Sequence, residues 1–253
     1  MPMRTPPPAD GALLQGGTAV APAAEPPAIT AKRIRDLPIL RDATPAAAER
    51  AAARARWRSY PAGTLILDIE DRSSDVYFIL EGKVRVQMRT PGGRELLLAE
   101  LAAGGLIGEI AAIDGEPRTA SCTAVLPSRL CILPADAFLE AACSSPAASL
   151  ALLRHTTRIL RRQAQRVLER EALPVRQRLC AELLRQSRPR QGAGEGGARI
   201  VSPPPAQHDL AARIGARREV VSREMAEMAR QGLIEKVRGG IVIPRPAALG
   251  VAE

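Results

Sequence analysis

The sequence predicts an α+β fold: a domain of short antiparallel strands, then a long helix, then a small helical domain with a β-hairpin. Three observations support this prediction. Short β-branched runs alternate with glycine turns, a later stretch repeats apolar residues at spacings of 3 and 4, and two short amphipathic segments flank a glycine near the C-terminus. The 253 residues suffice for two domains of ~100–200 residues each.

Residues 1–40 are predicted to form a disordered tail, because residues 1–29 are rich in Pro, Ala and Gly and show no apolar period. The first domain is placed at residues 41–145. It begins with a short helix over Pro45–Arg56, where "PAAAERAAARAR" consists of strong helix formers.

Short strands are expected between Trp57 and Pro134. The candidate runs are "TLILDI", "VYFIL", "KVRVQM", "ELLLAEL", "TASCTAVL" and "RLCIL". Turn signals such as "PAG", "EGK", "PGG" and "AAGG" separate them. In "KVRVQM" every second residue is apolar, which is typical of a half-buried strand. Many short strands joined by glycine turns predict an antiparallel barrel or sandwich.

Residues 146–173 are predicted to form a long dimerisation helix. Seven positions follow spacings of 3, 4, 3, 4, 3 and 4, and five of them are apolar: Leu150, Leu153, Thr157, Leu160, Ala164, Val167 and Glu171. Such a seam favours a coiled coil between two copies. A repeat this short also allows a single helix packed on its own domain, and that alternative stays open.

Residues 174–253 form the second predicted domain. Pro174 interrupts the long helix or starts the next one, "VRQRLCAELLRQ", and a flexible "RPRQGAGEGGAR" follows. This domain carries 14 basic and 8 acidic side chains, a net of +6, whereas residues 57–133 carry 8 and 10, a net of −2. The basic surplus favours a polyanionic partner, although a merely solvated basic face would look the same.

Two helices around Gly215 suit the reading of duplex DNA. Leu210 and Ile214 give the first helix a buried side, and Val221, Met225 and Met228 do the same for the second. The opposite side of the second helix offers side chains that can bond to base edges in a major groove, and the predicted DNA-binding residues are Arg217, Arg218, Glu219, Ser222 and Arg223. An ordinary amphipathic helix is the alternative. Aromatic residues make up 2% of the chain, which argues against stacking on single strands.

These residues resemble a known family. "LAARIGARREVVSREMAEMARQGLIEK" is similar to the winged helix-turn-helix of the CRP/FNR transcription regulators, and "REVVSR" resembles their recognition helix. The resemblance runs from about Trp57 to Pro244. It implies a jelly-roll-like β-roll sensor in the first domain, a dimerisation helix and a winged helix-turn-helix, with residues 218, 219, 222 and 223 contacting bases.

The stretch "IGEIAAIDGEPRTASCTA" could hold a cyclic nucleotide. Arg118 can donate two parallel hydrogen bonds to a phosphate, and Thr119 can add another donor. Glu109 can accept a hydrogen bond from a ribose 2′-hydroxyl. "GEIA" can begin a short helix whose amides face an anion. An ion pair between Glu109 and Arg118, with no ligand, explains the spacing equally well. "GEIA" and "PRTA" resemble the phosphate-binding cassette of cyclic-nucleotide-binding domains, and "YPAGTLI" and "SSDVYFILEGKVRV" resemble its early strands. The resemblance implies an effector site of Gly108, Glu109, Ile110, Ala111, Arg118, Thr119 and Ala120.

The base that such a site would read stays open. Cyclic-AMP-responsive members place neighbouring hydroxyls on the long helix, where this chain has Gln163 and Ala164, or Arg166 by a second count. The iron–sulfur sensors of the family that the chain resembles use a cysteine cluster near the N-terminus, whereas no cysteine precedes Cys122 here. Its haem sensors bind through axial ligands, and neither His155 nor His208 shows the context of a second ligand. Neither cofactor is therefore expected. Metal ligands are not expected either. The scattered cysteines read as buried apolar residues of a reducing compartment.

The sequence therefore predicts a cytoplasmic, homodimeric transcription regulator, controlled by a small anionic effector such as cyclic AMP. The expected partners are a roughly palindromic DNA duplex and a second copy of the chain, with RNA polymerase as a further candidate and no membrane. A sensor tuned to another ligand, or to none, is the first alternative. A cyclic-nucleotide module that regulates a partner protein is the second. An enzyme is not expected, because no nucleophile–base pair or metal cluster is visible.

Overall fold

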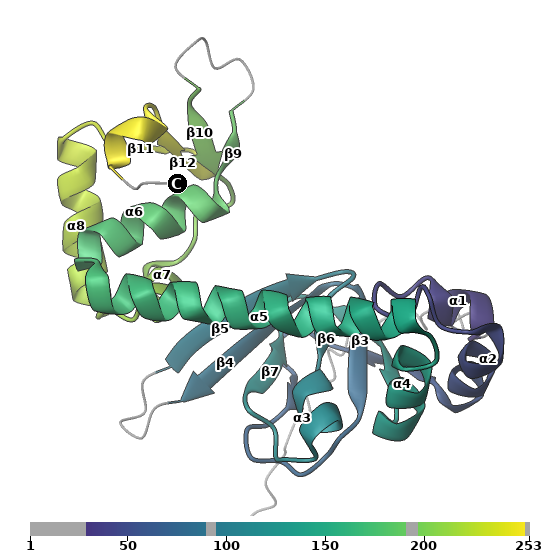
Figure 1. Cartoon of the computed structure of the whole chain (residues 1–253). Helices are drawn as coiled ribbons and strands as arrows, with labels where there is room; N and C mark the ends of the chain where they lie inside the picture. The colour runs from purple at the N-terminus through teal and green to yellow at the C-terminus, as the bar shows by residue number, and fades with distance from the viewer. Residues whose placement is uncertain (1–28, 90–94, 191–196, 251–253) are drawn as a thin grey trace, which may run out of the picture.

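The computed structural model describes residues 29–89, 95–190 and 197–250. It confirms the predicted α+β fold: two antiparallel sheets form the first domain, a long helix runs beside them, and a small domain lies at the far end of that helix (Figure 1). No helix among the described residues is both long and apolar enough to cross a lipid bilayer.

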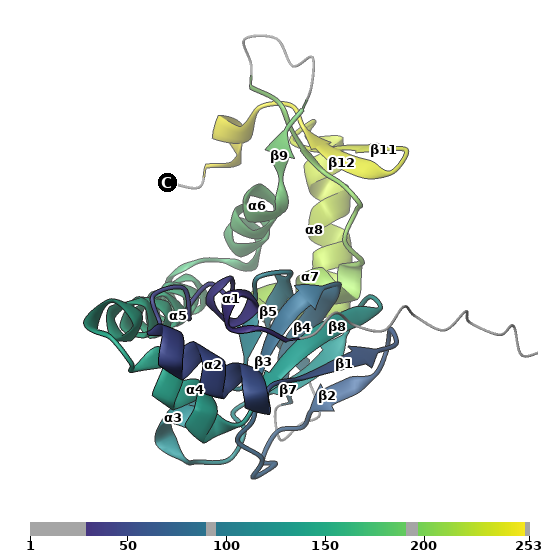
Figure 2. The same cartoon turned by 90° about the vertical axis from the view of Figure 1, so that its right-hand side faces the viewer.

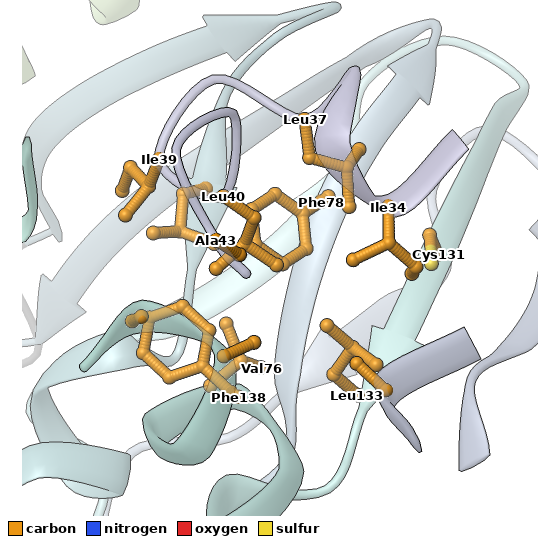
Figure 3. Packing of buried hydrophobic residues seen from close by; sticks show 14 of the residues in the cluster. Ile34, Leu37, Ile39, Leu40, Ala43, Val76, Phe78, Cys131, Leu133 and Phe138 are labelled. Atoms are coloured by element: carbon orange, nitrogen blue, oxygen red, sulfur yellow. The ribbon is translucent and has the colours of Figure 1, made fainter. Parts of the chain in front are cut away.

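The segment before the first strand is folded. Helix α1 spans Ala31–Arg35 and α2 spans Pro45–Arg54. Apolar side chains of this segment pack on Phe78 and Phe138 (Figure 3). They are Ile34, Leu37, Ile39, Leu40 and Ala43. The predicted tail boundary at residue 40 is therefore wrong for 29–40.

The physical reason is the apolar character of the residues that follow residue 29. The Pro- and Ala-rich composition of the first residues gives way at Ile34 to a short apolar group that completes the core of the first domain. Leu40 is fully buried there, and burying a leucine stabilises a fold by about 1.5–3 kcal/mol. Residues 1–28 lie outside the described part of the chain.

The β-roll consists of two four-stranded antiparallel sheets. One has the order β1-β8-β3-β6 and the other β2-β7-β4-β5. Their strands are β1 Arg56–Tyr60, β2 Leu65–Leu67, β3 Val76–Glu81, β4 Lys83–Arg89, β5 Glu95–Ala102, β6 Leu106–Ile107, β7 Ser121–Ala124 and β8 Ser128–Leu133. The six predicted runs all contain strands. β1 and the two-residue β6 were not predicted, because "RWRSY" and "LI" are too polar or too short to show a strand period.

Three helices accompany the β-roll. α3 spans Glu109–Asp114, as "GEIA" predicts, and α4 spans Ala135–Ala142, which the sequence reasoning did not identify. α5 spans Pro146–Ala172 and confirms the predicted long helix. It begins sharply because Ser145 Oγ accepts a hydrogen bond from the amide of Ala148 and proline occupies the first turn.

The C-terminal domain has its own core. Its helices are α6 Val175–Gln186, α7 Gln207–Ile214 and α8 Arg218–Arg230, followed by the short helix η1 Pro246–Leu249. Its sheet has the order β11-β12-β10-β9, with β9 Arg188–Pro189, β10 Arg199–Val201, β11 Glu235–Val237 and β12 Gly240–Ile243. The segment "RPRQGAGEGGAR" was predicted to be flexible, but its two ends pair as β9 and β10, while residues 191–196 lie outside the description.

Candidate ligand cavity and nucleic-acid interface

A cavity of about 1510 Å³ opens between the β-roll and α5. Its lining residues come mainly from the β2-β7-β4-β5 sheet, β6, α3 and α5, with a few from α6 and α7. Figure 1 shows α5 running beside the β-roll. All seven residues predicted for effector binding line it: Gly108, Glu109, Ile110, Ala111, Arg118, Thr119 and Ala120. The fold thus brings "GEIA" and "PRTA" to one wall of a single space.

Gly108 connects β6 to α3 in a backbone conformation that favours glycine. Its φ is +86°, in the left-handed region. A Cβ placed on it would lie 2.6 Å from Arg118 Nη1 and 2.7 Å from the carbonyl oxygen of Asp75. Glycine is therefore required at residue 108 both by its φ and by the close approach of the arginine.

Arg118 is 3% exposed and is held by three oxygen acceptors. Its Nε donates to Ser73 Oγ at 3.1 Å, Nη1 donates to the Gly108 carbonyl at 2.9 Å, and Nη2 donates to the Asp75 carbonyl at 2.7 Å. A guanidinium has more N–H donors than these contacts use. Arg118 is thus fixed in the cavity wall with donors to spare for an anion.

The alternative of an ion pair between Glu109 and Arg118 does not match this geometry. Within the described residues, Arg118 bonds to two carbonyls and a hydroxyl, while the Glu109 carboxylate faces a histidine. The two side chains line the same cavity without forming a salt bridge with each other. Each is therefore available to a separate group of a ligand.

Glu109 meets His155, which projects from α5. His155 Nε2 lies 3.4 Å from Glu109 Oε1, and the side chains are 17% and 7% exposed. The sequence reasoning gave this histidine no role. The spacing on α5 could have revealed it, because His155 lies 3 residues after buried Leu152 and 4 before half-buried Ile159, on the helix face that packs on the roll.

The same face of α5 supplies the polar end of the cavity. Gln163 and Arg166 both line it, whereas Ala164 lies on the exposed side of the helix. Arg166 Nη1 donates to the Leu97 carbonyl at 2.8 Å, which ties α5 to β5. Burial lowers the pKa of Arg166, and the neighbouring arginines 185, 213 and 170 lower it further, against the opposite effect of the Glu182 carboxylate. At this end of the cavity Arg166 therefore contributes positive charge and Gln163 contributes a side-chain amide.

The cysteines are free thiols. Cys122 lines the cavity, and burial raises its pKa to about 12. Burial likewise raises the pKa of Cys131 to about 12. These thiols stay protonated at neutral pH and pack as small apolar groups, as predicted. Cys143 departs from the prediction because it is exposed.

Large apolar side chains form an exposed stripe along α5, and two of them, Leu150 and Leu153, also line the cavity. The large members of the stripe are Leu150, Leu153, Leu160, Val167 and Leu168, with exposed fractions of 45%, 61%, 69%, 59% and 59%. Four of the five belong to the predicted seam. A single helix packed only on its own domain would bury this stripe, so the geometry favours the coiled-coil alternative.

The C-terminal domain has the layout of a helix-turn-helix. α7 ends at Ile214, and Gly215, its C-cap, takes a φ of +66° and turns the chain towards α8. Val221, Met225 and Met228 are buried as predicted and fix one side of α8 on the domain core. The five predicted DNA-binding residues, Arg217, Arg218, Glu219, Ser222 and Arg223, lie at its N-terminal half, outside that core. This is the part of a recognition helix that reaches base edges.

The hairpin after α8 corresponds to a wing. β11 and β12 pair in antiparallel register, with Val237 opposite Gly240. Lys236 and Arg238 are exposed on this hairpin. Exposed cations beside the recognition helix suit contacts with the phosphates that flank a binding site.

Ion pairs connect the C-terminal domain to the β-roll. Arg85 of β4 lies 2.8 Å from Asp209 of α7 and 2.9 Å from Glu100 of β5, and Glu100 also lies 2.9 Å from Arg213 of α7. Burial would raise the pKa of Glu100, but the hydrogen bond from Arg85 and the nearby Arg213 outweigh it, so the pKa is lowered. Figure 2 shows α7 above β4 and β5. Glu100 and Arg213 also line the cavity, so the ligand space extends to the domain contact.

Two domain families match the chain. Residues 57–144 match the cyclic nucleotide-binding domain and residues 177–251 the Crp-like helix-turn-helix domain. Over 175 residues the chain is 32% identical to the CRP-like cAMP-activated global transcriptional regulator of Mycobacterium tuberculosis, a match that covers 69% of this chain and 78% of that protein. It is 34% identical over 200 residues to the cyclic AMP receptor protein of Thermus thermophilus, a match that covers 76% and 85%.

Solved structures give the same fold. A CRP/FNR-family transcriptional regulator from Thermus thermophilus superposes with a TM-score of 0.59 at 26% identity, covering 77% of this chain and 96% of that chain. The c-di-GMP responsive global regulator CLP of Xanthomonas campestris superposes with a TM-score of 0.66 at 20% identity, covering 79% and 99%.

Proposed function

The chain belongs to the CRP/FNR family of transcription regulators, and from this premise we propose a homodimer that binds duplex DNA under the control of a cyclic nucleotide such as cyclic AMP. One observation supports the effector above all others. All four residues of "GEIA" and the last three of "PRTA" line one cavity, and Arg118 and Glu109 form no salt bridge with each other there. The two relatives that are 32% and 34% identical to this chain carry cyclic AMP in their names.

The cavity offers complementary partners to a cyclic nucleotide. Arg118 would use its remaining N–H donors on the phosphate oxygens, as a charge-assisted bond, and Thr119 would add a donor beside it. Glu109 would accept from the ribose 2′-hydroxyl. Gln163 and Arg166 would face the base end of the ligand. No cofactor takes part in this scheme.

The exposed stripe on α5 would form the dimer. Leu153 and Leu160 are more than half exposed in the single chain, and two copies of the helix packed against each other would cover them. A two-fold axis along this seam would present two recognition helices. The two-fold symmetry requires a roughly palindromic site, and a spacing of about 34 Å between the helices would place the half-sites one duplex turn apart. RNA polymerase stays a further candidate partner.

Ligand control would pass through the junction of α5 and α6. α5 ends at Ala172, Leu173 is extended, and Pro174 precedes α6. The cavity reaches both α5 and the contact between Glu100 and Arg213, so a ligand would act on the helix and on the domain contact together. Coupling between two such sites is typically ~1–3 kcal/mol and is reciprocal.

A sensor tuned to another ligand is a second candidate, and one observation favours it. Gln163 and Arg166 occupy the wall where hydroxyl pairs would be expected for cyclic AMP. Titration calorimetry of the purified protein with cyclic AMP and cyclic GMP separates the two candidates. We expect saturable binding of at least one of them, strengthened by DNA that carries a binding site. Absence of binding to both, by a protein that still selects among DNA duplexes, would replace the first candidate with the second.

A further inference from the structure

Glu109 is a buried carboxylate with one polar side-chain neighbour. It is 5% exposed, and within the described part of the chain the side-chain atom placed to bond it is His155 Nε2, 3.4 Å from Oε1. A carboxylate removed from water is costly unless a donor accompanies it. His155 thus supplies the side-chain donor that the buried Glu109 carboxylate needs.

The direction of the bond follows from the chemistry of the two groups. An ionised carboxylate only accepts, so Nε2 must carry the hydrogen, either in the neutral tautomer or in the charged ring. Because the contact involves Oε1, the second oxygen stays available to a hydroxyl of a ligand. At 3.4 Å the contact is longer than an ordinary N–H···O bond, which leaves room for it to shorten.

His155 is itself held in place by the helix that carries it. α5 packs on the roll through Ala148 and Leu152, which are buried, and the histidine comes next on the same face. Its side chain is 17% exposed and lines the cavity. A ring fixed in this way can select one orientation of the Glu109 carboxylate.

We infer that His155 is a positioning residue for the recognition of the ribose 2′-hydroxyl. It orients the Glu109 carboxylate from α5, and it thereby couples ligand binding at Glu109 to that helix. The inference rests on the proposed function, because it requires a cyclic nucleotide whose 2′-hydroxyl meets Glu109. It goes further by assigning a selective role to a residue outside "GEIA" and "PRTA". The dimerisation helix then contacts the ligand through an acidic residue of α3.

The test compares cyclic AMP with 2′-deoxy-cyclic AMP. Calorimetry would be run on the full chain and on His155→Ala, His155→Gln and Glu109→Gln. His208→Ala is the matched control, because His208 is the chain's other histidine and lies on α7 with a 69% exposed side chain. Thermal unfolding of each variant would verify that the fold is retained.

We expect His155→Ala to weaken cyclic AMP binding by about tenfold, a factor that corresponds to about 1.4 kcal/mol. The affinity for 2′-deoxy-cyclic AMP should change less than about twofold, because that ligand lacks the group that Glu109 holds. His155→Gln should recover part of the loss because its amide can still donate, and Glu109→Gln should lose the preference for the ribose form.

Two results would overturn the inference. Equal losses for both ligands would mean that His155 acts on the fold or on another part of the nucleotide, and no loss for either would remove it from the site. In both cases the proposed function stands, since the unchanged chain still binds. If the unchanged chain binds cyclic GMP and not cyclic AMP, the same comparison is made with cyclic GMP and 2′-deoxy-cyclic GMP. If it binds neither cyclic AMP nor cyclic GMP, the proposed function fails and the inference fails with it.

Discussion

Replacing Gly108 with alanine should disrupt both the stability and the anion-binding capacity of the sensor. The new methyl group would lie 2.6 Å from Arg118 Nη1 and 2.7 Å from the carbonyl oxygen of Asp75, and the carbonyl cannot move without displacing the start of β3. Gly115, at the other end of α3, offers a matched control. It has a φ of +74°, close to the +86° of Gly108, but a Cβ there would meet nothing within 4 Å.

The magnitudes follow from these two environments. Gly115→Ala should cost about 1–2 kcal/mol, the usual penalty for a left-handed backbone with a side chain. Gly108→Ala should cost a similar amount plus about 1–3 kcal/mol for the overlap, so about 2–5 kcal/mol in all. For a chain of this size, each 1 kcal/mol lowers the melting temperature by about 2–4 °C.

The assay combines thermal unfolding with titration of cyclic AMP. We expect Gly108→Ala to melt at a clearly lower temperature than Gly115→Ala and to bind the nucleotide weakly even below its melting transition, because Arg118 has moved. If the two variants melt together and bind equally well, the close approach of Arg118 to residue 108 is not a feature of the protein in solution, and the argument about the glycine is refuted.

Four further substitutions test separate parts of the account. Arg118→Leu should abolish binding of cyclic AMP, since a buried guanidinium is its proposed phosphate partner, and unchanged affinity in calorimetry would exclude that role. Leu160→Glu should convert the dimer to monomers in sedimentation, because it puts a charge in the centre of the exposed stripe; a stable dimer would reject the seam. Arg223→Ala should cost ~1–3 kcal/mol on the preferred duplex and relax one base preference, whereas equal loss on every sequence would limit Arg223 to phosphate contact. Glu100→Gln should lower the free energy of unfolding by about 2 kcal/mol at neutral pH, because the carboxylate pairs with two arginines. The pKa of Glu100 is lowered by folding, so its stabilisation is present above the unfolded pKa and disappears as pH falls through the folded pKa; a difference between Glu100→Gln and the unchanged chain that persists in acid would contradict this sign.

Much of the fold was predictable because its signals are local. Alternation in Lys83–Arg89 identifies a strand without knowledge of its partners, and the spacing of Val221, Met225 and Met228 identifies the buried side of α8. The position of Gly215 between two short helices is likewise a local property of the chain. In each case the side chains that specify the element lie within a few residues of one another.

The features that escaped prediction depend on distant contacts. The residues around Leu40 are buried only because Phe78 and Phe138, far along the chain, leave an apolar surface for them. The meeting of His155 and Glu109 joins residues 46 positions apart, through the way α5 crosses the roll. Sequence spacing can place each residue on one face of its own helix or strand. It cannot show which other helix or strand that residue will contact.

The candidate site shows the same division. The seven residues predicted from the resemblance of "GEIA" and "PRTA" to a phosphate-binding cassette all line the cavity. The opposite wall on α5 was left open between Gln163, Ala164 and Arg166, and the structure turns the first and third towards the cavity. The domain contact through Glu100 and Arg213 had no sequence signal, because single charges on strands and helices are usually solvated.

The central claim is that an anion receptor in the β-roll controls the reading of DNA by α8. Fluorescence anisotropy with labelled duplexes, selected from a random pool at physiological ionic strength, tests it directly when run with and without saturating cyclic AMP. We predict a preference for particular duplexes that the nucleotide strengthens about 5- to 150-fold, with the same factor in the tightening of nucleotide binding by DNA. Equal affinity for all duplexes under both conditions would contradict the account.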